Sequence, residues 1–299
     1  MPNLSTISSR IHHGAAALAI LTLPACAPRT DIASTSLPAG SKYVSMGSSF
    51  ASGPGITTTA DVRCRRSRDN YGHQLARSRQ LALVDVSCGG ATTAHILGPR
   101  DELPPQIDAV TPDTRLVTIT IGGNDLGLMV GLIAASCEGE AAAGMHSATC
   151  RRLLTRLPNG FVVPVPDEAA WARVESAMDE ISREVRRRAP HARLVFIDRF
   201  RVLPPSGVCA EVPLSEAAAV RYRAMADRMA RIDAAVAERA SADLVKASEL
   251  SRDHSACAKD PWLTGFLIPA GARPDLTPYH PNLAGMTAIA AAIDAQLGK

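Results

Sequence analysis

The sequence from residue 42 to residue 49 is Lys42-Tyr43-Val44-Ser45-Met46-Gly47-Ser48-Ser49. The segment Lys42–Met46 is short and largely apolar, which predicts a buried strand of a parallel sheet. A glycine and two serines follow at once, at the sheet edge where α/β folds place their ligands. A serine there can act as a nucleophile when a base activates it, and glycine permits the tight turn that exposes its hydroxyl. Taken alone, these residues also fit an ordinary turn.

The rest of the chain repeats this pattern of a short apolar strand and a longer amphipathic segment. Further strands are expected at Leu81–Val86, Leu116–Ile121, Arg193–Ile197 and Asp243–Val245. Apolar residues spaced three and four apart predict helices over Asp167–Arg188, Ser215–Arg239 and Leu283–Leu297. The alternation predicts an α/β fold, a three-layer α/β/α sandwich with helices on both faces of a central, mostly parallel five-stranded sheet.

Two further expectations concern individual segments. In the helix at Ser215–Arg239, the side chains expected to face the core are Val220, Met225, Met229, Ile232 and Val236. Residues Cys137–Pro166 have weak periodicity and contain two cysteines, so an irregular excursion near one end of the sheet is expected there.

The composition is that of a soluble globular protein. Of 299 residues, 46% are hydrophobic and 20% are charged, which excludes a disordered chain, a collagen-like repeat and a multispanning membrane protein. The formal charge is +3, from 32 basic and 29 acidic residues. This charge is too small to indicate the concentrated basic face of a nucleic-acid-binding protein, so no nucleic-acid partner is expected.

The N-terminal residues have the pattern of an export signal. Residues 1–25 contain no acid and a short apolar run, which predicts a secretory signal peptide. Residues 26–41, rich in Ala, Ser, Thr and Pro, predict a flexible tether before a single domain at 42–299. Because Leu23-Pro24-Ala25-Cys26 resembles a bacterial lipobox, Cys26 is a candidate lipidation site that would attach the protein to the outer face of the membrane. Ordinary cleavage nearby would instead release a secreted protein.

Six cysteines remain after Cys26, and their even number in an exported chain favours disulfides. They are Cys64, Cys88, Cys137, Cys150, Cys209 and Cys257. Spacing alone does not select one pairing among them. The chain contains no Cys-x-x-Cys pair, so a zinc site is not expected.

Three other segments carry residues suited to catalysis. Residues 87–93 include two adjacent glycines, the second of them Gly90, whose backbone N–H groups are accessible to an anion, but they lack the spacing and lysine of a phosphate loop. Asn124, in Gly122-Gly123-Asn124-Asp125, can stabilise an oxyanion through its side-chain N–H or cap a helix. His280 directly precedes the last expected helix, where a lone histidine is more often structural than catalytic.

Together, these segments occur in the order and positions of the SGNH (GDSL) hydrolase family, which the chain resembles from Tyr43 to its last helix. The resemblance implies a flavodoxin-like fold in which Ser49 is the nucleophile and His280 is the general base. It also implies that Gly90 and Asn124 form the oxyanion hole. A protein of this kind hydrolyses carboxylic esters as an esterase or lipase, acts on acyl esters or lipids, and needs no metal or organic cofactor.

The cysteines resemble those of actinobacterial secreted lipases and esterases of this family, which have three disulfides. The resemblance implies sequential pairing of Cys64 with Cys88, Cys137 with Cys150, and Cys209 with Cys257. The protein is therefore expected to be oxidised and either secreted or held in the cell envelope. We also expect it to be a monomer.

The sequence departs from the family pattern at two positions. Ser48 stands where the family usually has an aspartate before the nucleophile, and Thr277 stands where it has an aspartate three residues before the histidine. Asp275 is the nearest carboxylate and a candidate third member of the triad. The alternative is a backbone carbonyl that orients His280 and leaves a dyad.

Two other functions are open on sequence grounds. Deacetylation or acyl transfer on an envelope glycan would use the same serine and histidine. A non-catalytic surface lipoprotein that binds a ligand would keep the fold, and the departures at Ser48 and Thr277 motivate that alternative. For the hydrolase, activity is expected to fall as His280 protonates, near its usual pKa of about 6.5.

Overall fold

The central sheet consists of five parallel strands. The computed structural model describes residues 37–142, 147, 150–151, 155, 163–267 and 277–298. The strands, in their order across the sheet, are β4 (Ala82–Asp85), β1 (Lys42–Gly47), β5 (Thr114–Thr120), β6 (Arg193–Ile197) and β7 (Asp243–Val245). Every neighbouring pair is parallel, which confirms the predicted sheet. A short antiparallel pair outside this sheet, β2 (Thr59–Asp61) and β3 (Arg66–Ser67), is not among the predicted strands.

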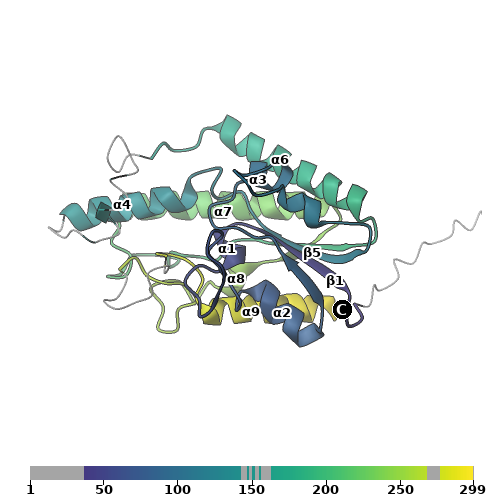
Figure 1. Ribbon diagram of the computed structural model, residues 1–299. Coiled ribbons are helices and arrows are strands. Elements are labelled where there is room, and N and C mark those ends of the chain that lie inside the picture. Colours follow the sequence, from purple (N-terminus) through teal and green to yellow (C-terminus); the bar gives the residue numbers. More distant parts are fainter. Residues whose placement is uncertain are drawn as a thin grey trace, which may run out of the picture. The chain divides into compact units, whose positions relative to one another are not determined.

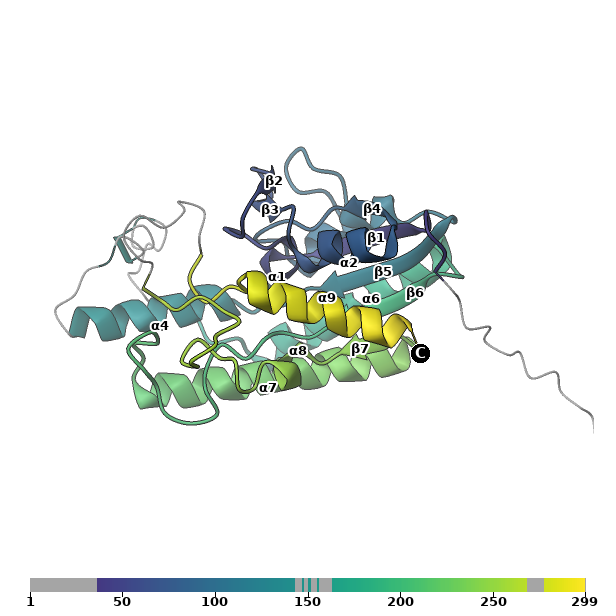
Figure 2. The ribbon, with the colours of Figure 1, turned by 90° about the horizontal axis from the view of Figure 1, so that it is seen from below.

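Helices cover both faces of the sheet and complete the predicted α/β/α sandwich (Figure 1). They are α2 (Tyr71–Arg79) and α9 (Leu283–Leu297) on one face, and α3 (Thr93–Leu97), α6 (Glu168–Arg188) and α7 (Glu216–Arg239) on the other. Figure 2 shows α2 and α9 side by side. Successive strand residues point to opposite faces, so Tyr43 packs in the core with α2 and α9, and Val44 packs with α6 and α7. Because helices cover both faces, the central strands β1, β5 and β6 are buried along most of their length.

Side-chain caps determine where the three predicted long helices begin. The caps are Asp167 for α6, Ser215 for α7 and Asn282 for α9, and each accepts a hydrogen bond from the backbone N–H three residues later. The prediction of these helices is confirmed. The inward orientation expected for Val220 is wrong: Val220 is 56% exposed, because Ala219 occupies the buried position at that turn of α7.

Helix α4 (Leu128–Ala142) is not among the predicted helices. It continues through the first residues of the excursion expected over Cys137–Pro166, and most of the remaining residues of that range lie outside the described ones. Apolar residues surround α4 instead of following one stripe, so its sequence has no clear helical period. A Cβ atom on Gly139 would lie 2.1 Å from the Pro213 carbonyl oxygen, so glycine is required where α4 approaches that segment.

The carboxyl ends of β4, β1 and β5 lie next to one another in the sheet. β1 leads into the short helix α1 (Ser49–Ser52), and β4 and β5 lead into the loops that contain Gly90 and Asn124. The predicted site residues on these three strands are therefore brought to one edge. The remaining short elements are α8 (Ala247–Leu250) and a 3₁₀ helix at Gln106–Ala109.

Three disulfides cross-link the described part of the chain. They are Cys64–Cys88, Cys137–Cys150 and Cys209–Cys257, which confirms the sequential pairing implied by the family resemblance. The first ties the loop between β2 and β3 to the segment after β4. In the part of the chain that the structure describes, no helix has the length and apolar character needed to cross a bilayer. Those residues also contain no group of three or more His, Cys, Asp or Glu side chains arranged to hold a metal ion.

Candidate active site

The chain turns sharply between β1 and α1, and this turn fixes Ser49. Gly47 has a φ of +136°, and a Cβ atom there would lie 2.4 Å from the Thr120 carbonyl oxygen, so only glycine fits beside β5. The side-chain amide of Gln106 accepts a hydrogen bond of 2.7 Å from the Gly47 N–H and donates one of 3.1 Å to the Gly47 carbonyl. The Ser48 N–H donates to the Thr120 carbonyl at 2.9 Å. Ser49 therefore begins α1 from a backbone that is held on both sides.

Ser49 and His280 form a hydrogen-bonded pair. Nε2 of His280 lies 2.8 Å from Ser49 Oγ, and Nδ1 lies 2.8 Å from the Pro278 carbonyl oxygen. Because a carbonyl only accepts, Nδ1 carries the proton and donates it to Pro278. Nε2 then has no proton and accepts the hydrogen bond of the Ser49 hydroxyl. Both side chains are buried, and the ring of Phe50 packs against the imidazole with 5.2 Å between ring centres.

Backbone contacts fix the segment that carries His280. Tyr279 has a φ of +61°, and its hydroxyl shares a hydrogen bond of 2.7 Å with Ser136 of α4. The Thr264 N–H donates to the His280 carbonyl at 2.9 Å, and the Thr264 hydroxyl donates to the Thr277 carbonyl at 2.8 Å. Thr264 is a site residue that sequence reasoning missed, because no local pattern marks a threonine whose only role is to hold a distant turn.

Burial lowers the pKa of His280 to about 4. The largest cause is desolvation, which disfavours the charged imidazolium. The hydrogen bond to the Pro278 carbonyl raises the pKa, and the Arg65 cation lowers it further. A histidine whose pKa is lowered becomes charged only below that value, so His280 is neutral at neutral pH. The pKa of about 6.5 expected from the sequence is therefore too high for this site.

The segment after β4 places Gly90 in a tight turn. The Ala91 N–H donates to the Cys88 carbonyl at 3.0 Å, and the φ of Gly90 is +84°. The disulfide to Cys64 and a 2.8 Å hydrogen bond from the Gly89 N–H to the Cys64 carbonyl anchor this turn. Gly90 is exposed, and no described residue accepts a hydrogen bond from its N–H. That N–H is available to an oxygen atom of a ligand.

Asn124 lies in the loop after β5 and reaches the same turn. Its side-chain amide donates one hydrogen bond of 2.8 Å to the Ala91 carbonyl, which leaves a second N–H to donate to a ligand. Asp125 accepts hydrogen bonds from the Thr93 N–H at 3.1 Å and the Thr93 hydroxyl at 2.5 Å, so the loops after β4 and β5 are joined. Because the Asn124 side chain binds the neighbouring loop, the capping role considered for it is not the one observed.

An arginine holds the start of the loop after β5. Arg199 donates a hydrogen bond to the Ile121 carbonyl, and its guanidinium lies 3.6 Å from the buried carboxylate of Asp233. A Cβ atom on Gly123 would lie 2.5 Å from Arg199 Nε, so this arginine packs directly under the loop that carries Asn124. Neither Arg199 nor Asp233 stands out in the sequence, because no spacing relates these two residues to the loop after β5.

The structure brings four predicted site residues to one edge of the sheet: Ser49, Gly90, Asn124 and His280. Thr277, in the position of the family's usual aspartate, accepts a hydrogen bond of 3.2 Å from Arg65, and the Nδ1 partner of His280 is the next residue's carbonyl. Asp275 and Cys26 lie outside the described residues, so the roles predicted for them stay predictions.

Comparison with known proteins gives consistent results. Residues 45–288 match the GDSL-like Lipase/Acylhydrolase family. The chain is 31% identical over 251 residues to Lipase 2 of Streptomyces coelicolor, with 81% of each protein covered. It is 28% identical over 281 residues to a lipase of Streptomyces rimosus, with 91% of this chain and 93% of that protein covered. The crystal structure of the extracellular lipase of Streptomyces rimosus matches with a TM-score of 0.66 at 25% identity, covering 86% of this chain and 99% of that one.

We expect the imidazole of His280 to stay neutral as the pH is lowered to about 4, because burial disfavours its charged form. An NMR titration of histidine-labelled protein should show the ring resonance of His280 changing with a midpoint near that pH. The His280→Gln variant identifies the resonance by its loss. A midpoint above about 6, close to the usual value for histidine, would contradict the effect of burial.

Proposed function

This chain belongs to the GDSL-like lipase/acylhydrolase family of carboxylic-ester hydrolases, and we propose that Ser49 is its nucleophile and His280 its general base. The proposal is carried by the 2.8 Å contact between Ser49 Oγ and His280 Nε2, since the Pro278 carbonyl determines that Nε2 is the unprotonated nitrogen. Serine is a weak nucleophile until an adjacent base takes its proton. The lowered pKa of His280 keeps that base neutral at physiological pH.

The proposed reaction proceeds through an acyl-enzyme. Ser49 Oγ attacks the ester carbonyl carbon while His280 accepts the hydroxyl proton, and the imidazolium then gives that proton to the leaving alcohol. The N–H groups of Gly90, Asn124 and Ser49 stabilise the negative charge that develops on the carbonyl oxygen. Water hydrolyses the acyl-enzyme in the same way, with His280 again acting as the base. These steps need no chemistry that a metal or organic cofactor would supply.

We propose that a backbone carbonyl orients His280, so that Ser49 and His280 act as a dyad. The Pro278 carbonyl already accepts the Nδ1 proton at 2.8 Å, which is the orienting task that a triad carboxylate performs. The direction of the pKa shift supports this. A carboxylate beside the ring would raise the pKa of His280. Among the described residues, the charged group that shifts this pKa is the cation of Arg65, which lowers it.

We propose acyl esters or lipids as the substrates. The relatives described above are lipases. A small cavity of about 50 Å³ is lined mainly by apolar side chains, including Phe50, Leu128 and Phe200, and also by three arginines. Phe50 lines this cavity and also packs against the imidazole of His280, although Ser49 and His280 themselves do not line the cavity. An apolar lining favours an acyl chain over a sugar, whose hydroxyls need hydrogen-bond partners, and this disfavours glycan deacetylation on the same residues.

We propose that the protein is exported. Three disulfides are typical of proteins in oxidising compartments outside the cytosol, and the similar lipase of Streptomyces rimosus is extracellular. The predicted signal peptide and the candidate lipidation site Cys26 lie in residues that the structure does not describe. Release into the medium, attachment through Cys26 and the monomeric state therefore stay predictions.

A fluorophosphonate should label this protein at Ser49, because the reagent reacts with a serine that a base has activated. Ser48 is a matched control, since it is the adjacent serine and is as buried as Ser49. We expect Ser49→Ala to abolish the adduct and to lower kcat by about 10⁴-fold or more, as for other serine nucleophiles. Ser48→Ala should keep the adduct. Peptide mass spectrometry and p-nitrophenyl ester assays measure both effects, and a fully active Ser49→Ala would refute the assignment.

Replacing Asp275 by Asn distinguishes the dyad from a triad. Loss of a carboxylate that orients the catalytic histidine costs about 10⁴-fold in kcat. Because the Pro278 carbonyl holds Nδ1 here, we expect Asp275→Asn to retain kcat within a few-fold of the wild-type enzyme. Steady-state assays on a short p-nitrophenyl ester provide the measurement. A loss comparable with that of a triad aspartate would show that Asp275 orients His280.

A further inference from the structure

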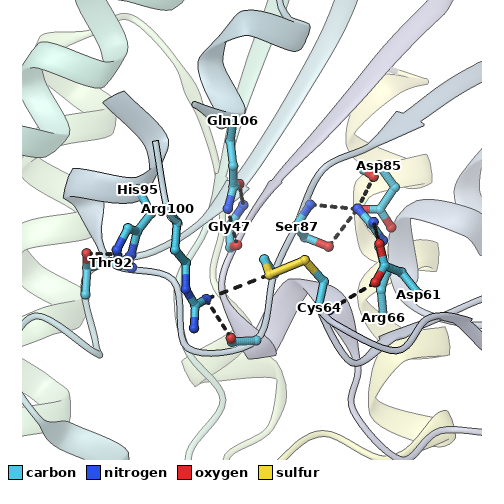
Figure 3. The surroundings of a disulfide bond; sticks show 12 residues. Gly47, Asp61, Cys64, Arg66, Asp85, Ser87, Thr92, His95, Arg100 and Gln106 are labelled. Carbon is cyan, nitrogen blue, oxygen red and sulfur yellow. Dashed lines mark hydrogen bonds and ion pairs between the residues drawn. A yellow bond between two sulfur atoms is a disulfide. The ribbon is translucent and has the colours of Figure 1, made fainter. Parts of the chain in front are cut away.

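The guanidinium of Arg100 lies against the turn that carries the Gly90 N–H, and Figure 3 shows it beside the Cys64 disulfide. Arg100 Nη1 donates a hydrogen bond of 2.9 Å to the Gly89 carbonyl and lies 3.8 Å from Cys88 Sγ. The Arg100 backbone is itself fixed, because its N–H and carbonyl exchange hydrogen bonds with those of Leu103. Among the described residues, no carboxylate lies within ion-pair distance of this guanidinium. Its charge therefore acts on the turn without an acidic partner.

The turn at residues 88–91 can adopt two geometries that differ in one peptide. The hydrogen bond from Ala91 to Cys88 closes the turn, and the φ is positive at Gly90 but not at Gly89, which identifies a type II turn. A type I turn has a different ψ at Gly89, by about 150°, and a different φ at Gly90, by about 170°. These are the dihedral angles on either side of the peptide between the two glycines. The two types therefore interconvert by a flip of that peptide. Glycine at position 90 permits both.

The direction of this peptide determines whether Gly90 can donate to an oxyanion. In a trans peptide, the carbonyl and the N–H point in opposite directions. A guanidinium bound to the Gly89 carbonyl therefore leaves the Gly90 N–H pointing to the other side, where no described residue accepts it. A flip to type I would turn the N–H away from that side. It would also present the negative end of the carbonyl dipole there, which repels an oxyanion.

The other contacts of the turn hold different peptides. The bond from the Gly89 N–H to Cys64 fixes the peptide between Cys88 and Gly89, and the disulfide fixes the side chain of Cys88. Asn124 binds the Ala91 carbonyl, which belongs to the peptide between Ala91 and Thr92. Among the described residues, the side-chain contact on the peptide between Gly89 and Gly90 is that of Arg100.

We propose that Arg100 is a positioning residue that holds the Gly89–Gly90 peptide with its N–H directed at the oxyanion. The proposal rests on the proposed function, because it assigns Gly90 as an oxyanion donor. The cationic hydrogen bond to the Gly89 carbonyl also polarises the amide, and this strengthens the Gly90 N–H as a donor. Arg100 thus acts on the reaction through Gly90.

The test compares Arg100→Met, which removes the donors, with Arg100→Lys, which keeps a cation and a donor. The measurements are kcat and KM for a p-nitrophenyl ester, and the Ki of an alkyl trifluoromethyl ketone, which forms a tetrahedral oxyanion adduct with a serine nucleophile. Removing an oxyanion donor outright costs about 10²- to 10³-fold in kcat, so the loss of its positioning should cost about 10- to 100-fold. We expect KM to change little, Ki to rise in proportion to the loss in kcat, and Arg100→Lys to recover most of both.

Arg115→Met is the matched control. Arg115 also donates to backbone carbonyls, those of Pro112 and Thr114, but it lies at the end of β5 opposite to the site. Its kinetics should equal those of the wild-type enzyme. If the methionine variant does not fold, Arg100→Ala, which also removes the donors, takes its place in the comparison with Arg100→Lys, and thermal unfolding of each variant checks this.

The outcomes separate this proposal from the proposed function. An equal loss in the lysine and methionine variants, a loss confined to KM, or an unchanged kcat and Ki in Arg100→Met overturns the role of Arg100. If Ser49→Ala is inactive in the same assays, the proposed function stands even though the role of Arg100 has failed. A fully active Ser49→Ala would instead refute the proposed function itself.

Discussion

The hydrogen bond between Ser49 and His280 joins parts of the chain that are 231 residues apart in sequence. Ser49 follows strand β1, which lies between β4 and β5 in the sheet. His280 precedes the last helix, α9, which packs on the same face of the sheet as α2. The contact forms because the chain holds a positive φ at both ends of it, at Gly47 before the serine and at Tyr279 before the histidine. Burial of the pair then sets its chemistry, since it keeps the imidazole neutral and the Nε2 atom ready to accept a proton.

Main-chain carbonyls hold most of the described site. The carbonyl of Pro278 determines the tautomer of His280, that of Ala91 holds Asn124, and that of Gly89 is bound by Arg100. A carbonyl keeps its polarity at every pH, whereas a carboxylate loses its charge in acid. The histidine is therefore the group whose protonation should determine when activity falls on the acid side. This arrangement also explains how the site forms with Thr277 in the position where the family usually has an aspartate.

Features that obey a local rule could be predicted from the sequence, and features that depend on tertiary contacts could not. The strands are short apolar runs, and each of the three long helices has a side-chain cap and a clear period, whereas the apolar residues of α4 do not follow one stripe. Ser49, Gly90, Asn124 and His280 could be found because each follows a strand or precedes a helix in a known order. Gln106 and the other supporting side chains could not, since they act across long sequence separations and no spacing marks them. Likewise, the contact between His280 Nδ1 and the Pro278 carbonyl belongs to a turn that no local sequence pattern marks.

The most direct test is the crystal structure of the protein after reaction with an alkyl fluorophosphonate, whose phosphoryl oxygen occupies the position of the oxyanion. We predict a bond from Ser49 Oγ to phosphorus. The phosphoryl oxygen should lie about 3 Å from the backbone nitrogen of Gly90 and from Asn124 Nδ2, with Arg100 still bound to the Gly89 carbonyl. Phosphorus on another residue, or a phosphoryl oxygen directed away from Gly90 and Asn124, would contradict the proposed site.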